Sequence, residues 1–143
     1  MYLIIIQAVA AIFAFSSGLH DVPAINVFRR CGSSDRDQKV FHISNSFLKG
    51  LLLLLSGMLL REVGYEWKIV ILEVIACLFL IWQIFDLTIN LTRNGNFSWD
   101  YLGGKNVIDV WLRNHGGKNA GKIKAFGCIA MVIISNVLIL KTL

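Results

Sequence analysis

Charged residues are scarce in this sequence. Asp, Glu, Lys and Arg make up 16% of the 143 residues, against 56% hydrophobic residues. Proline occurs once, and the mean hydropathy is +0.65. An ordinary soluble domain carries about 25% charged residues, so this chain lacks the charge that a water-facing surface requires. Because the apolar residues also stand in long blocks, the composition favours a membrane protein over a soluble one.

Cysteine and the common catalytic motifs are equally sparse. The three cysteines are Cys31, Cys77 and Cys128; no two have the spacing of a ligand pair, and their odd number argues against a disulfide framework. The sequence contains no phosphate-binding loop string, no His-Glu-x-x-His pattern and no serine in a nucleophile elbow. These absences favour a non-enzymatic protein without a cofactor, although they do not exclude an enzyme.

The apolar blocks predict an all-α membrane protein that forms a single domain over residues 1–143. A transmembrane helix needs about 20 apolar residues. Four such helices are expected, so the fold predicted is a four-transmembrane-helix bundle. Their approximate ranges are 2–28, 41–60, 67–91 and 123–141.

The long segment 92–122 is expected to be a loop that carries a short interfacial helix near residues 106–115. Glycine pairs stand on either side of that helix, and glycine interrupts helical structure. Trp99, Tyr101 and Trp111 are expected at the level of the lipid headgroups, where aromatic side chains are enriched in membrane proteins.

The basic residues predict an orientation. Residues 29–39 and 93–124 hold ten of the fourteen Lys and Arg residues, and in a four-span topology both segments lie on one side. The positive-inside rule then places loops 29–40 and 92–124 in the cytoplasm and both termini outside. This asymmetry accounts for the net charge of +5 without nucleic acid. The expected partners are the lipid bilayer and either other membrane subunits or further copies of the chain.

Polar residues interrupt the apolar blocks at helical spacing and are expected to gather near the cytoplasmic ends of the helices. The predicted intramembrane polar cluster comprises Asp21, His42, Asn45, Lys49, Gln83, Asp86 and Asn90. A lysine within the bilayer costs about 2.5–3.5 kcal/mol at the helix centre. We therefore expect Lys49 to pair with Asp86 or Asp21, in contact with His42 and Asn90.

Glu73 lies nearer the outer end of its helix, where Arg61 or Lys68 is its expected partner. The histidines and nearby acids are possible ligands of a divalent metal, because imidazole and carboxylate are common metal ligands. Their spacing matches no recognised metal-binding motif. The candidate ligands are His20, His42, Asp86 and His115, with Asp21 and Asp109 as further acids.

Three functions remain open. The small size favours a non-enzymatic structural or accessory subunit of a larger membrane assembly, such as a bacterial complex or the membrane of a phage or virion. The alternatives are a channel, holin or small transporter whose polar cluster lines a path, and a metal-dependent membrane enzyme. In the first case the polar cluster only holds the helices together.

Overall fold

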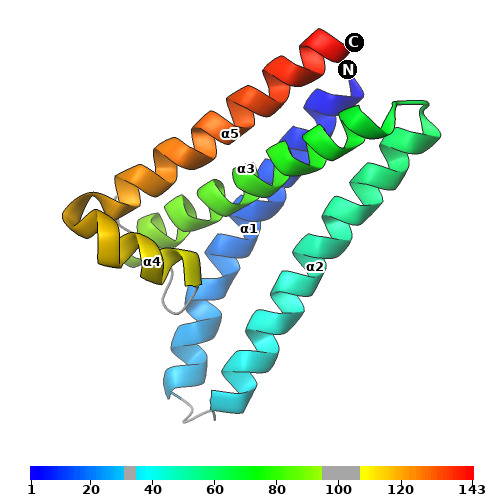
Figure 1. Cartoon of the computed structure of the whole chain (residues 1–143). Coiled ribbons are helices and arrows are strands. Elements are labelled where there is room, and N and C mark those ends of the chain that lie inside the picture. Colours follow the sequence, from blue (N-terminus) through cyan, green and yellow to red (C-terminus); the bar gives the residue numbers. More distant parts are fainter. Residues whose placement is uncertain (31–34, 95–106) are drawn as a thin grey trace.

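The computed structural model describes the backbone of residues 1–30, 35–94 and 107–143. Side chains are described over the same ranges except for residues 22–30, 35–42, 45, 93 and 94. The elements are α1 (Tyr2–Arg30), α2 (Asp35–Glu62), α3 (Trp67–Asn94), α4 (Val107–Gly116), the 3₁₀ turn η1 (Gly117–Asn119) and α5 (Ala120–Thr142) (Figure 1). The long helices continue past the predicted apolar ranges because helical hydrogen bonding extends into the polar residues at their ends.

Three segments are long and apolar enough to cross a membrane: Tyr2–Asp21, Trp67–Thr92 and Val107–Thr142. They belong to α1, α3 and the stretch from α4 to α5. Helix α2 is not among these segments, and residues 35–42 and 45 within it lie outside the described side chains. The described chain is thus helical, with three candidate membrane spans.

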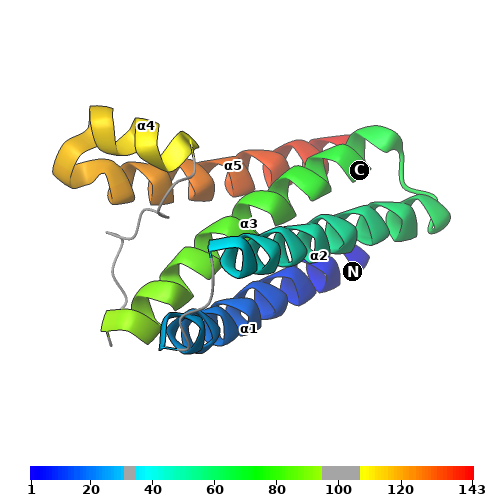
Figure 2. The ribbon, with the colours of Figure 1, turned by 90° about the horizontal axis from the view of Figure 1, so that it is seen from below.

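Helix α3 lies at the centre of the bundle, between α1 and α5 (Figure 2). Helix α2 runs beside α3 and joins it through a tight turn. In that turn Gly64 adopts φ +95°, which favours glycine, and its backbone N–H donates to the Arg61 carbonyl at 2.9 Å. The turn lies at the same end of the molecule as both chain termini (Figure 1).

Small residues allow α1 to approach α3 closely. Ala10, Ala14 and Gly18 are small, and they follow Ile6 at intervals of four residues. All four residues therefore lie on one face of α1, and all are buried. A Cβ added at Gly18 would lie 2.6 Å from Thr88 Cβ on α3. In membrane bundles such a small-residue face permits close van der Waals packing between helices.

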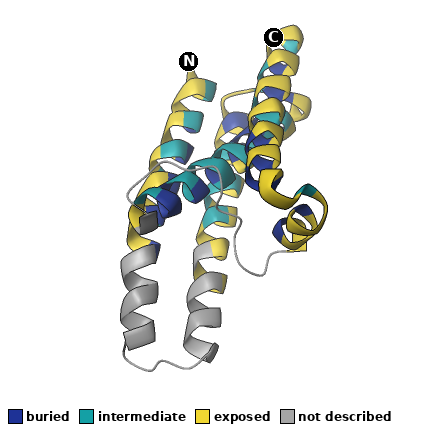
Figure 3. Cartoon of the chain, turned by 90° about the vertical axis from the view of Figure 1, so that its left-hand side faces the viewer, coloured by how far each residue is buried: buried dark blue, intermediate teal, exposed yellow. Residues whose placement is uncertain are grey.

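The outward faces of the long helices are apolar. Large hydrophobic side chains such as Ile4, Phe47 and Leu140 are more than two-thirds exposed. Exposed residues cover the outer sides of the helices, whereas buried residues face their neighbours (Figure 3). A surface of this kind suits lipid or a partner helix rather than water.

Candidate functional site

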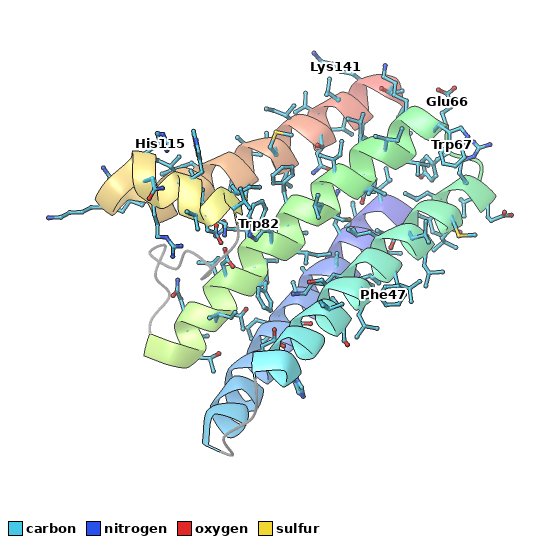
Figure 4. The ribbon with its side chains drawn as sticks, turned by 60° about the horizontal axis from the view of Figure 1, so that its bottom comes forward. Phe47, Glu66, Trp67, Trp82, His115 and Lys141 are labelled. Carbon is cyan, nitrogen blue, oxygen red and sulfur yellow. The ribbon has the colours of Figure 1, made fainter. Side chains whose placement is uncertain are left out.

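A buried ion cluster joins α3, α4 and α5. The Lys124 ammonium on α5 forms ion pairs with the carboxylates of Asp86 on α3 and Asp109 on α4; the Lys124 Nζ to Asp109 Oδ1 distance is 2.7 Å. All three residues are buried, Asp109 to 1% exposure. Lys124 Nζ also lies 4.5 Å from the ring centroid of Trp82, and Figure 4 shows Trp82 on the side of α3 that faces α4 and α5.

Each helix positions its charge for a local reason. The buried residues of α5 recur at helical spacing, and most are small: Ala120, Gly121, Lys124, Ala125, Cys128, Ser135 and Ile139. The small residues around Lys124 let α5 approach α3, so the lysine side chain is enclosed between the helices. Asp109 lies in the first turn of α4, where the helix dipole favours a negative charge.

The three side chains of this cluster carry a net negative charge when all are ionised, since two carboxylates share one ammonium. Lys49 on α2 adds a positive charge that acts on Asp86 and on Asp21. Buried charges are tolerated only when they are paired. The cluster therefore holds α4 and α5 to α3 through contacts that each depend on the same lysine.

The predicted Lys49–Asp86 pair is wrong, because the ion pair of Asp86 is with Lys124; the alternative that Lys49 pairs with Asp21 stays a prediction. Asp86 pairs with Lys124, which the sequence had placed in the cytoplasmic loop. The Lys49 ammonium lies 3.5 Å from the centroid of the Phe85 ring, and Lys49 is half-buried. A cation over an aromatic face is stabilised by the ring, so this pair is one contact between α2 and α3.

The other predicted cluster residues are distributed over three helices, α1, α2 and α3. Asp21 is buried on α1, Asn90 is buried on α3, and Gln83 on α3 is half-buried.

Asp21 lines a hollow between α1 and α2. The hollow has a volume of about 300 Å³ and is lined by Phe13, Ser16, Ser17, His20, Asp21, Ser44 and Leu48. The side chains of His42 and Asn45 lie outside the described set.

The predicted partners of Glu73 are also wrong. Its Oε2 accepts a hydrogen bond from Gln7 Nε2 on α1 at 2.9 Å, and the same nitrogen donates to Asn136 Oδ1 on α5 at 2.9 Å. Arg61 instead donates to the Tyr65 carbonyl and lies over the Trp67 ring. Helical depth had placed Glu73 near the basic residues, but its face of α3 turns toward α1 and α5.

Metal ligation receives no support from the geometry. In the part of the chain that is described, no three His, Cys, Asp or Glu side chains lie close enough together to hold a metal ion. His20 and His115 are exposed, and the His115 Nδ1 lies 2.8 Å from the Trp111 carbonyl oxygen. His42 belongs to the side chains that are not described.

Of the predicted aromatic residues, only Trp111 lies in a described segment. It is exposed on α4 and stacks on His115, with ring centroids 4.7 Å apart. Trp99 and Tyr101 fall within residues 95–106, outside the described part.

Lys124 and Asp109 are the residues that sequence reasoning missed as a pair. The available signal was the run of small residues around Lys124, which marks a buried face of α5. The requirement that Asp86 find a cation was correct in principle. Choosing between Lys49 and Lys124 needed the relative placement of α2 and α5 around α3.

We expect Asp109→Ala to loosen α4 locally. The substitution removes one of the two carboxylates on Lys124 and leaves the Asp86 pair in place, so the loss of stability should be about 1–3 kcal/mol. Backbone hydrogen exchange over Val107–Gly116 should become faster in the variant. Asn114→Ala, on the exposed side of α4, is the matched control. Equal exchange rates in the two variants would show that the Lys124–Asp109 ion pair does not hold α4 in place.

The chain matches no protein-family model, and comparisons with curated proteins and with solved structures found no match.

Proposed function

We propose that this chain is an integral membrane protein with four spans that serves as a non-enzymatic structural or accessory subunit of a larger membrane assembly. In this proposal α2 is the fourth span, both termini lie outside, and loops 29–40 and 92–124 are cytoplasmic. The leucine-rich composition of residues 47–60 and the clustering of basic residues in the two loops support this topology.

Helix α4 is proposed to lie in the cytoplasmic interface. Its buried residues are Asp109 and Leu112, which face the bundle. Val107, Ile108 and Trp111 are exposed and would contact lipid in this position. A short helix with apolar side chains on lipid and an acid turned to the protein suits the headgroup region.

The observation that carries the subunit proposal is the exposed face of α2. We call it the α2 outer face; it consists of Phe47, Leu48, Leu51, Leu54, Leu55, Met58 and Leu59, all exposed. Figure 4 shows Phe47 projecting away from the bundle. These residues recur at intervals of three and four, the spacing with which side chains of one helix fit between those of another. Since α2 makes less extensive contacts with the bundle than α1 or α5, this face is suited to a partner helix.

The buried polar groups also favour a structural role. Lys124, Asp86 and Asp109 contact one another, and Glu73 contacts Gln7. A hydrogen bond between membrane helices, such as that between Gln7 and Glu73, contributes about 0.6 kcal/mol on average. They hold helices together without needing a substrate or a conducted ion.

The test is the size of the complex in native membranes. Extracted in a mild detergent, the wild-type chain should migrate as a stoichiometric complex larger than the monomer. Leu55→Trp keeps the α2 outer face apolar but blocks close packing, and it should weaken assembly about tenfold, which corresponds to 1.4 kcal/mol. Ile4→Trp, on the exposed face of α1, is the matched control and should assemble normally. A wild-type protein that is monomeric in mild detergent would contradict the proposal.

A transport function is the second candidate, and the hollow between α1 and α2 is the observation that favours it. Its lining combines the acid Asp21 with hydroxyl groups such as Ser17 and Ser44, which is the chemistry of a wet path for a cation or a polar solute. Liposomes containing the purified protein should then show ion flux that falls in Asp21→Asn but not in Asp109→Asn. If the liposomes show no ion flux, the transport function is contradicted and the subunit function remains the proposal.

A further inference from the structure

Glu73 lies where three helices meet. Its side chain is 1% exposed, and it is contacted by Gln7 from α1, while the Gln7 amide in turn contacts Asn136 from α5. Glu73 lies six residues into α3, or about 9 Å from Trp67 at about 1.5 Å per residue. The ion cluster at the far end of α3 does not involve it, and the proposed subunit function does not require an acid here.

The groups that contact this carboxyl are neutral. Gln7 offers an amide N–H to Oε2, and the Cys77 thiol lies 3.7 Å from Oε1. The described basic residues at this end, Arg61, Lys68 and Lys141, are all exposed, and no described ion pair includes Glu73. A buried carboxylate without a cation is costly, whereas the neutral acid can be buried with ordinary hydrogen bonds.

The positions of the neighbouring groups suit a protonated Glu73 carboxyl at each of its two oxygens. In a protonated carboxyl one oxygen is a carbonyl acceptor and the other carries the O–H. Oε2 already accepts from Gln7, so it takes the carbonyl role. Oε1 then carries the proton. The Cys77 thiol, which donates to Oε1 at 3.7 Å when the acid is ionised, becomes a weak acceptor instead. Gln7 keeps its position, and at Cys77 only the thiol hydrogen has to rotate for this arrangement to form.

A metal cation fits less well than a proton. An ion that bridged the oxygens of Glu73 and Asn136 would have to lie between them. The Gln7 Nε2 occupies that position, at 2.9 Å from both oxygens, and its hydrogens would face an incoming cation. A proton needs only one free lone pair on Oε1.

We propose that Glu73 is a proton-binding site inside the bundle, occupied at neutral pH while α1, α3 and α5 are packed together. Separation of these helices would admit water, and the exposed carboxyl would then release its proton to that water. Protonation is thereby linked to packing: the proton stabilises the closed junction, and its removal at high pH favours opening. The site would make any movement of α1 or α5 sensitive to pH.

The chain offers a direct test because it contains only three glutamates, Glu62, Glu66 and Glu73. Glu62 and Glu66 are exposed and serve as internal references. The full chain, labelled with ¹³C at the glutamate carboxyl carbons and placed in lipid nanodiscs, should show one protonated and two ionised carboxyl signals near pH 7. Three ionised signals near pH 7 would overturn the proposal.

Variants assign the signals and test the linkage. Glu73→Gln should remove the protonated signal, and the matched control Glu66→Gln should remove an ionised one. If Glu73→Gln does not fold, removal of both reference glutamates in the double variant Glu62→Gln/Glu66→Gln leaves Glu73 as the single remaining signal. Where Glu73→Gln folds, its stability should depend less on pH than that of the wild-type protein, from about pH 4.3, where an exposed glutamate ionises, upward. An unchanged pH dependence would overturn the linkage.

Discussion

Replacing Lys124 with methionine is expected to destabilise the protein by about 3–5 kcal/mol, the range for deleting one partner of a buried ion pair. Methionine fills a similar volume but leaves Asp86 and Asp109 as two buried carboxylates without a cation. Like charges held together without compensation raise the free energy of the folded state. Reversible unfolding in mixed detergent micelles, followed by tryptophan fluorescence, measures the loss.

Two further variants separate the charge from the volume. Lys122 is exposed on α5, two residues from Lys124, and Lys122→Met should change stability by less than about 0.5 kcal/mol. Replacing the whole cluster, with Lys124→Met, Asp86→Leu and Asp109→Leu together, should restore much of the lost stability because no unpaired charge remains. If Lys124→Met and Lys122→Met behave alike, the buried ion cluster does not stabilise the fold.

The second large effect is expected at Gly18. A Cβ at this position would lie 2.6 Å from Thr88 Cβ and 2.8 Å from Thr88 Cγ2, so α1 and α3 would have to move apart. Overpacking of this kind costs about 1–3 kcal/mol, and occasionally more. Gly18→Ala should therefore lower stability in the same unfolding measurement, and Gly18→Leu should lower it further.

Gly50 provides the matched control for Gly18. Both glycines lie within helices, so alanine gains the same backbone advantage of about 0.5–1 kcal/mol at each. A Cβ at Gly50 would meet nothing within 4 Å, and Gly50→Ala should therefore be neutral or stabilising. A Gly18→Ala variant as stable as Gly50→Ala would show that the α1–α3 contact can relax without loss.

The requirement for buried partners was predictable, whereas their identity was not. Asp86 lies in an apolar helix and needed a cation, and both Lys49 and Lys124 were available near the same end of the bundle. Helix α5 approaches α3 through small residues and carries Lys124 into contact, whereas Lys49 on the more loosely packed α2 reaches the Phe85 ring. Charge and sequence spacing do not contain this difference, because it depends on the distance between helices.

Glu73 illustrates the same limit for a single side chain. Its place in the sequence, close to the start of α3, suggested the basic residues of the nearby turn as partners. The direction of the side chain around the helix decided its partners, and that direction points to Gln7. In a membrane helix most faces are apolar. The spacing of hydrophobic residues in the sequence therefore does not distinguish the face that contacts protein from the face that contacts lipid.

Composition alone determined that this chain has little charge and long apolar helices. Three helical segments of the described structure are long and apolar enough to cross a membrane, and the fourth span stays a prediction. These features follow from the length and hydrophobicity of each segment, which are local properties. Only the tertiary structure decided which polar side chains meet: Lys124 with two aspartates, and Glu73 with Gln7. Lipid and protein interiors are similarly apolar, so the hydrophobic pattern could not rank the possible helix pairs. Close packing and the need to partner each buried polar group selected among them.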